Sequence, residues 1–96
     1  MLRITRGSGF QMTFSNGCTV SVQFGAGNYC QNYDGCFAKG RELGEKGSPN
    51  AEVAAYNADK EWITDRYPGA DSDSGVIGWL PADKVADFIH WVATRG

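Results

Sequence analysis

Two alternating runs of apolar residues, separated by a short turn sequence, constrain the fold more than any other part of this chain. In FQMTFSNGCTVSVQF, residues 10–24, every second residue is apolar on each side of Ser15-Asn16-Gly17. A period of two is typical of half-buried strands, so the stretch predicts a β-hairpin. Asn16-Gly17 alone would suggest a two-residue type I′ turn.

The register of this hairpin decides the length of its turn. A two-residue loop would set Phe14 opposite Thr19, which places apolar and polar side chains on the same face. A three-residue loop sets Phe14 opposite Cys18, and each further apolar residue opposite another apolar residue. Because directly opposed side chains share a face, only the longer loop gives one apolar face. We therefore predict a three-residue turn with Gly17 at positive φ, followed by a G1 bulge.

A helical pattern occupies the last part of the sequence. Four apolar residues recur at the spacing of one helical face: Val85, Phe88, Ile89 and Val92. Pro81 fits the first helical position, which makes Leu80 the N-cap, although leucine caps poorly. We expect the apolar residues to pack on the apolar sheet face, with Trp91 at the border. Three polar side chains then fall on the opposite face: Asp83, Asp87 and His90.

The middle of the chain is less regular. Residues 51–64, AEVAAYNADKEWIT, fit either a helix beginning after Pro49 or a hairpin that turns at 57–60. We favour the hairpin, because additional strands would bury the first sheet better. Residues 76–80, VIGWL, predict a short strand, in which Gly78 suggests a bulge or a close backbone contact.

Together these elements predict one α+β domain spanning residues 1–96. An antiparallel sheet of about four to five strands would pack against one C-terminal helix. The strands are the N-terminal hairpin, a middle hairpin and a short strand near 76–80. The length of 96 residues suits one domain, and 42 % apolar residues favour a folded globule.

The charge is mildly acidic and unevenly distributed. The formal net charge is −2, which does not fit the basic footprint of a simple DNA-binding domain. Residues 1–49 hold five Lys/Arg against three Asp/Glu, whereas residues 50–96 hold four against eight. An acidic second half suits a basic partner, and it equally suits an ordinary solvated surface.

Three cysteines and the N-terminal sequence bear on the cellular compartment. Cys18, Cys30 and Cys36 have the spacing C-x11-C-x5-C, which lacks the short knuckle of a zinc site. Residues 1–10 have no apolar signal-peptide core, and no apolar run reaches membrane-spanning length. We therefore expect a reducing cytoplasm and no membrane partner.

No motif in the sequence predicts a reaction. His90 is the only histidine, and no G-x-S-x-G motif supplies a nucleophile. Residues 25–28 lack the third glycine and the following helix of a dinucleotide fingerprint. ADSDSG, residues 70–75, resembles half of a calcium loop, but Ala82 falls where the bidentate Glu is needed. We expect no catalytic residue, no metal and no cofactor.

A glycine-rich segment and several acidic residues are the best candidates for a contact surface. Residues 25–50 hold six glycines together with aromatic residues, and long loops of this kind are usually functional. The alternative is that the aromatic rings simply cover the end of the sheet. The residues that we predict to contact a partner are Tyr29, Tyr33, Phe37, Asp59, Glu61, Asp65, Asp71, Asp73 and Trp91.

Two blocks of the sequence carry a family resemblance. FSNGCTVSVQFGAGNYC, residues 14–30, and GWLPADKVADFI, residues 78–89, resemble small proteins encoded by bacteriophages and prophages. The two blocks cover about a third of the chain. The resemblance implies an accessory phage protein of the host cytoplasm, and such proteins include inhibitors of host defence such as anti-CRISPR proteins. The helix opens LPAD, where a Ser or Thr cap would be expected before the proline.

These observations favour a binding module over an enzyme. The resemblance implies a phage-encoded accessory protein that binds and inhibits a host defence complex, such as a CRISPR–Cas effector, by occluding a protein surface. One alternative is a homo-oligomeric accessory or assembly protein, in its simplest form a homodimer. A third is a small nucleotide-binding protein or enzyme that uses the loop at 25–37. We expect no direct contact with nucleic acid.

Overall fold

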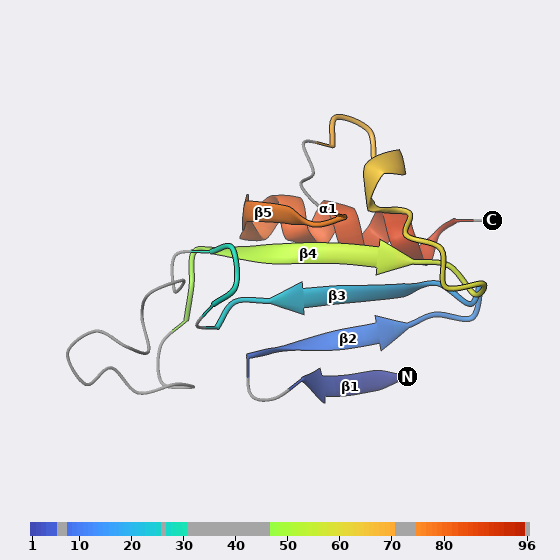
Figure 1. The fold of residues 1–96 in the computed structure, drawn as a ribbon, viewed down its shortest axis with the longest axis horizontal. Coiled ribbons are helices and arrows are strands. Elements are labelled where there is room, and N and C mark those ends of the chain that lie inside the picture. Colours follow the sequence, from blue (N-terminus) through green and yellow to red (C-terminus); the bar gives the residue numbers. More distant parts are fainter. Residues whose placement is uncertain (6–7, 26, 31–46, 71–74, 96) are drawn as a thin grey trace.

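The protein folds into a five-stranded antiparallel sheet with one helix packed on one face (Figure 1). The computed structural model describes residues 1–5, 8–25, 27–30, 47–70 and 75–95. The strands lie side by side in chain order: β1 Leu2–Thr5, β2 Gly9–Thr13, β3 Thr19–Gln23, β4 Asn50–Tyr56 and β5 Ile77–Pro81. The helices among these described residues are the 3-10 helix η2, Thr64–Arg66, and α1, Ala82–Ala93. The predicted α+β class, with one C-terminal helix on an antiparallel sheet, is confirmed.

The N-terminal hairpin has the predicted register. The N–H of Phe14 donates to the carbonyl of Cys18 at 2.9 Å, and the N–H of Gly17 donates to the carbonyl of Phe14 at 2.9 Å. Gly17 has φ +85°, as a three-residue turn requires. Met12 therefore opposes Val20, and Cys18 is buried on the apolar face of the sheet.

β1 is a strand that the sequence pattern did not predict. It pairs with β2, and Leu2 opposes Met12 while Ile4 opposes Phe10. LRIT holds only two apolar residues, which is too short a run to establish a period. The fifth strand of the sheet is thus at the N-terminal end and not in the middle of the chain.

Only the first half of the predicted middle hairpin is a strand. β4 ends at Tyr56, and the chain turns where predicted, with the N–H of Asn57 donating to the carbonyl of Glu61 at 2.9 Å. The returning segment makes a single bridge, Tyr56 to Trp62, and then enters η2. The hydroxyl of Thr64 accepts a hydrogen bond from the N–H of Ala55 at 3.0 Å. In a regular hairpin, a backbone carbonyl of the returning strand would accept that N–H.

The helix begins one residue later than predicted. Pro81 is the last residue of β5 and has an extended backbone, with φ −62° and ψ 157°, so it is the N-cap and Ala82 is the first helical residue. Phe88 and Val92 are fully buried against the sheet, and Trp91 is half-buried at the border as expected. The predicted polar residues of the opposite face are exposed: Asp83, Asp87 and His90.

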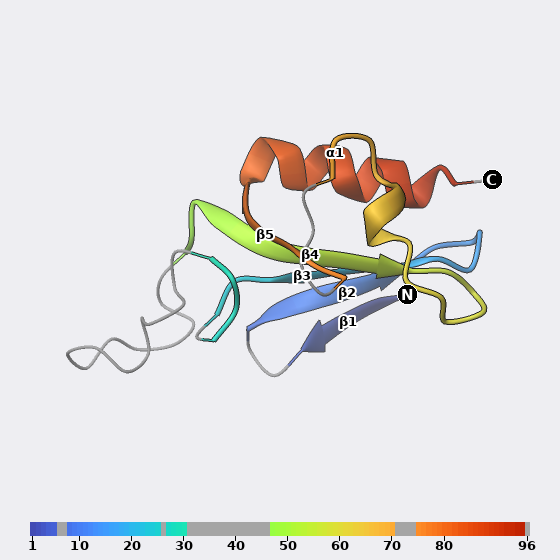
Figure 2. The same cartoon turned by 45° about the horizontal axis from the view of Figure 1, so that its top comes forward.

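α1 covers only part of the apolar sheet face. It packs mainly on β3, β4 and β5, behind the sheet in the view of Figure 1 and above it in Figure 2. The side chain of Asn16 in the hairpin turn donates to the carbonyls of Val92 at 2.9 Å and Arg95 at 2.8 Å, which ties the end of α1 to the sheet. Within the described part of the chain, no helix is long and apolar enough to cross a membrane.

Candidate functional site

The face of the sheet away from α1 is polar at its centre. Register places Ser21 opposite Ala54 and Gln23 opposite Glu52, on the side that does not carry the core valines. Figure 1 looks onto this face. A sheet whose second face meets water is expected to alternate in this way, so these polar residues alone indicate no site.

An exposed aromatic pair stands at one end of this polar face. The ring centroids of Tyr29 and Trp79 are 5.9 Å apart, and the two side chains are 41 % and 53 % exposed. The backbone fixes the pair, because the N–H of Trp79 donates to the carbonyl of Tyr29 at 2.7 Å. The N–H of Tyr29 in turn donates to the carboxylate of Glu52 at 3.0 Å. Residues 27–30 are thereby held across the start of β4 (Figure 1).

A bulge in β5 presents Trp79 to solvent. Ala51 opposes Leu80 and Val53 opposes Ile77, so two residues of β5 stand opposite Glu52 alone. Trp79 has φ +56°, a value that is uncommon for a residue other than glycine. Strain of this kind often occurs at functional sites.

Gly78 makes the crossing of two chain segments possible. A Cβ atom at this position would lie 2.7 Å from the Cβ of Tyr29 and 3.2 Å from its carbonyl oxygen. The sequence predicted a bulge or a close backbone contact at Gly78, and the structure contains both.

A second aromatic pair stands at the other end of the same face. Trp62 is 60 % exposed and packs edge-on against Tyr56, with ring centroids 5.8 Å apart at 78°. The ammonium of Lys60 lies 5.1 Å from the centroid of the Tyr56 ring. Glu52 beside the first pair and Tyr56 of the second are four residue steps apart in β4, about 13 Å of extended strand. We call the four residues the aromatic face: Tyr29, Tyr56, Trp62 and Trp79.

The turn beside Trp62 carries two exposed acidic residues. The side-chain oxygen of Asn57 accepts the N–H groups of Asp59 and Glu61, each at 3.0 Å. The amide nitrogen of Asn57 donates to the carboxylate of Glu61 at 2.9 Å. These bonds fix the turn and hold the carboxylate of Glu61 at the edge of the aromatic face, with the exposed residue Asp59 in the same turn.

The predicted contact residues do not form one surface. Tyr29, Asp59 and Glu61 belong to the aromatic face or its edge, and Asp65 is exposed in η2. Trp91 lies on the helix side of the molecule, packed between Tyr67 at 5.4 Å and the guanidinium of Arg95 at 4.3 Å. The remaining predicted contact residues lie outside the described residues: Tyr33, Phe37, Asp71 and Asp73. Cys36 also lies outside them.

Trp62 and Trp79 are exposed residues that were not among the predicted contact residues. The number of tryptophans and tyrosines in so small a domain indicates that several of them reach the surface, but not which ones. For Trp79, Gly78 is an additional signal, because a bulge after it rotates the next side chain out of the pleat.

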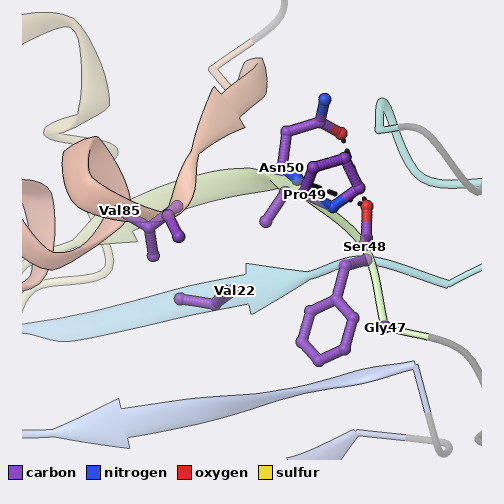
Figure 3. Close-up of a pocket in the computed structure, with 9 residues that line it drawn as sticks. Val22, Gly47, Ser48, Pro49, Asn50 and Val85 are labelled. Atoms are coloured by element: carbon purple, nitrogen blue, oxygen red, sulfur yellow. Dashed lines mark hydrogen bonds between the residues drawn. The ribbon is translucent and has the colours of Figure 1, made fainter.

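A shallow cavity lies on the helix side of the sheet (Figure 3). Its volume is about 260 Å³, and Val22 of β3 and Val85 of α1 form two of its sides. The segment 47–50 forms another wall, with Phe24 and two alanines completing the described lining. None of these lining residues is charged, so they offer no group for acid–base chemistry.

The described residues contain no cluster of three or more side chains that could hold a metal ion. His90 is exposed on α1, away from the aromatic face. Cys18 and Cys30 are buried free thiols.

No family model, no curated protein and no solved structure matches this chain.

Proposed function

We propose that this protein acts by binding another protein in a stoichiometric complex, and that the aromatic face is its contact surface. The observation that supports this proposal is the exposure of Trp62 and Trp79 on one face of the sheet. Tryptophan and tyrosine dominate the residues that contribute most to protein interfaces. A side chain that already packs against a neighbour loses less entropy on binding, and the ring contacts of Trp79 with Tyr29 and of Trp62 with Tyr56 provide such packing.

The proposed partner is a host defence complex, such as a CRISPR–Cas effector in the host cytoplasm. This part of the proposal rests on the resemblance to phage-encoded proteins. The charge distribution supports it, because the second half of the chain holds eight acidic residues against four basic ones. Asp59 and Glu61 at the edge of the aromatic face would meet the basic surface with which such a complex holds nucleic acid.

The test is a DNA-cleavage assay with purified effector complexes of several CRISPR types. We expect the protein to inhibit one of them fully at an equimolar ratio, as an occluding inhibitor should. The double variant Trp62→Ala/Trp79→Ala should weaken inhibition about a thousandfold, since two hot-spot residues at about 2 kcal/mol each contribute about 4 kcal/mol together. The matched control is His90→Ala, which alters an exposed residue on the other side of the molecule.

Two results would contradict the proposal. Absence of binding and inhibition with every complex would exclude the defence-related partner. Unchanged inhibition by the double variant, with circular dichroism showing an intact fold, would exclude the aromatic face as the contact surface.

A further inference from the structure

The opposite edge of the sheet carries a second exposed apolar surface. Met1, Leu2 and Ile4 are 78 %, 73 % and 83 % exposed. Leu2 opposes Met12 and Ile4 opposes Phe10, so both side chains continue the apolar face on which α1 packs. Natural edge strands usually avoid exposed apolar residues, because an unpaired edge recruits other strands.

The outward hydrogen-bonding groups of β1 belong to these same two residues. The amine of Met1 donates to the carbonyl of Thr13 at 2.9 Å, and the N–H of Thr13 donates to the carbonyl of Met1 at 2.8 Å. Such bonded pairs alternate with non-bonded pairs along an antiparallel ladder. Leu2 and Ile4 therefore direct their N–H and C=O groups away from β2. The sheet order ends at β1, and no described strand pairs with this edge.

The residue between Leu2 and Ile4 is Arg3, and its positive charge lies on the opposite face of the sheet, away from α1. Arg3 is exposed, and one of its guanidinium nitrogens donates to the side-chain oxygen of Gln11 at 3.3 Å. No described carboxylate forms an ion pair with it. An added strand would therefore meet two apolar side chains on one face and a cation on the other.

We propose that β1 binds an extended segment of a partner protein as an added antiparallel strand. The segment would have an acidic residue flanked on each side by an apolar residue. The two apolar residues would form bonded pairs with Leu2 and Ile4 and lie beside their side chains. The acidic residue would oppose Arg3 in the non-bonded pair, where Cα atoms approach to about 4.5 Å.

The charge at Arg3 favours this occupant over a second copy of the chain. Self-pairing that uses both Leu2 and Ile4 would centre its twofold axis on Arg3 and set two guanidinium groups directly opposite each other. Like charges in that position destabilise a ladder. β1 and the aromatic face lie at opposite edges of the sheet, so this proposal does not depend on the proposed function.

The test is an NMR titration of the uniformly ¹⁵N-labelled full chain with the peptide acetyl-Ser-Thr-Val-Glu-Val-Thr-Ser-amide. We expect the amide signals of Leu2 and Ile4 to shift most. A peptide with Lys in place of Glu should bind about five-fold more weakly or worse, which is the size of one cross-strand charge pair. The variant Arg3→Glu should reverse this preference. If that variant does not fold, Arg3→Gln should abolish the preference.

Backbone methylation provides the matched control. Methylating the nitrogens of both peptide valines removes the N–H groups that face β1 and should abolish binding. Methylating the nitrogen of the peptide glutamate removes an outward N–H and should leave binding intact. The proposal is overturned if the Glu and Lys peptides bind equally, if the valine-methylated peptide binds, or if signals far from β1 respond instead. It is also overturned if sedimentation shows a dimer that Arg3→Glu disrupts.

Discussion

Replacing Asn16 with alanine should destabilise the fold far more than its place in a surface turn suggests. The side-chain amide of Asn16 donates to the carbonyls of Val92, Ala93 and Arg95 at 2.9, 3.3 and 2.8 Å. Its oxygen accepts the N–H of Cys18 at 2.9 Å. Asn16 therefore donates to carbonyls of the last turn of α1 and of Arg95 just beyond it, a region where a helix leaves carbonyls short of intrahelical donors.

The magnitude follows from the number of bonds that one amide can make. The amide group has two N–H donors, so about two of the carbonyl bonds and the one accepted bond count fully. At about 1 kcal/mol each, and with water able to replace part of the loss at this half-buried site, Asn16→Ala should cost about 2 kcal/mol. For a domain of this size, that lowers Tm by about 10 °C.

Urea unfolding measures this loss directly, provided that the free energy of unfolding falls with urea concentration at the same slope in both proteins. Asn16→Asp is the most informative variant, since aspartate keeps the turn acceptor but removes both donors and puts a negative charge at the negative end of the helix. It should destabilise at least as much as alanine. Ser15→Ala, at an exposed position in the same turn, should cost less than about 0.5 kcal/mol. A fully stable Asn16→Asp protein would refute the reasoning, because a purely local turn accepts either residue.

Three further substitutions test the packing described above. Gly78→Ala should cost about 1–3 kcal/mol, because its Cβ would meet Tyr29 at 2.7 Å; unchanged stability in urea would show that residues 27–30 are not held there. Thr64→Val should cost about 1–3 kcal/mol in calorimetry by leaving the N–H of Ala55 unpaired, whereas Thr64→Ser should keep most of the stability; equal losses would contradict the hydrogen bond. Phe88→Ala should cost about 3–5 kcal/mol, since the ring is fully buried between the sheet and Tyr67; a loss below about 1 kcal/mol would mean that α1 does not pack there.

Local sequence patterns predicted the elements that depend on local physics. Alternation across Phe14 and Cys18 was sufficient to choose a three-residue turn, because the wrong register would have mixed the two faces. The stripe that includes Phe88 and Val92 predicted α1, since only one face of a helix can be buried on a sheet. Both predictions needed only neighbouring residues.

Long-range contacts were not predictable in the same way. Asn16 was identified as a turn residue, but its bonds reach residues 76 to 79 positions away in the sequence. β1 is too short to show a period, and it forms because β2 offers a free edge. Part of the candidate site also depends on contacts between distant residues. Trp79 faces solvent because of a bulge in β5, and Tyr29 reaches Trp79 only because Gly78 lacks a side chain.

The most direct measurement of the central claim is the hydrogen–deuterium exchange footprint of the protein bound to the effector complex that it inhibits. The account predicts an equimolar complex in which exchange slows in residues 52–62 and 77–80, around the aromatic face. The amides on the outer face of α1, residues 82–93, should exchange as in the free protein. Protection confined to α1, or failure to form a complex with any effector, would contradict the assignment of this surface to partner binding.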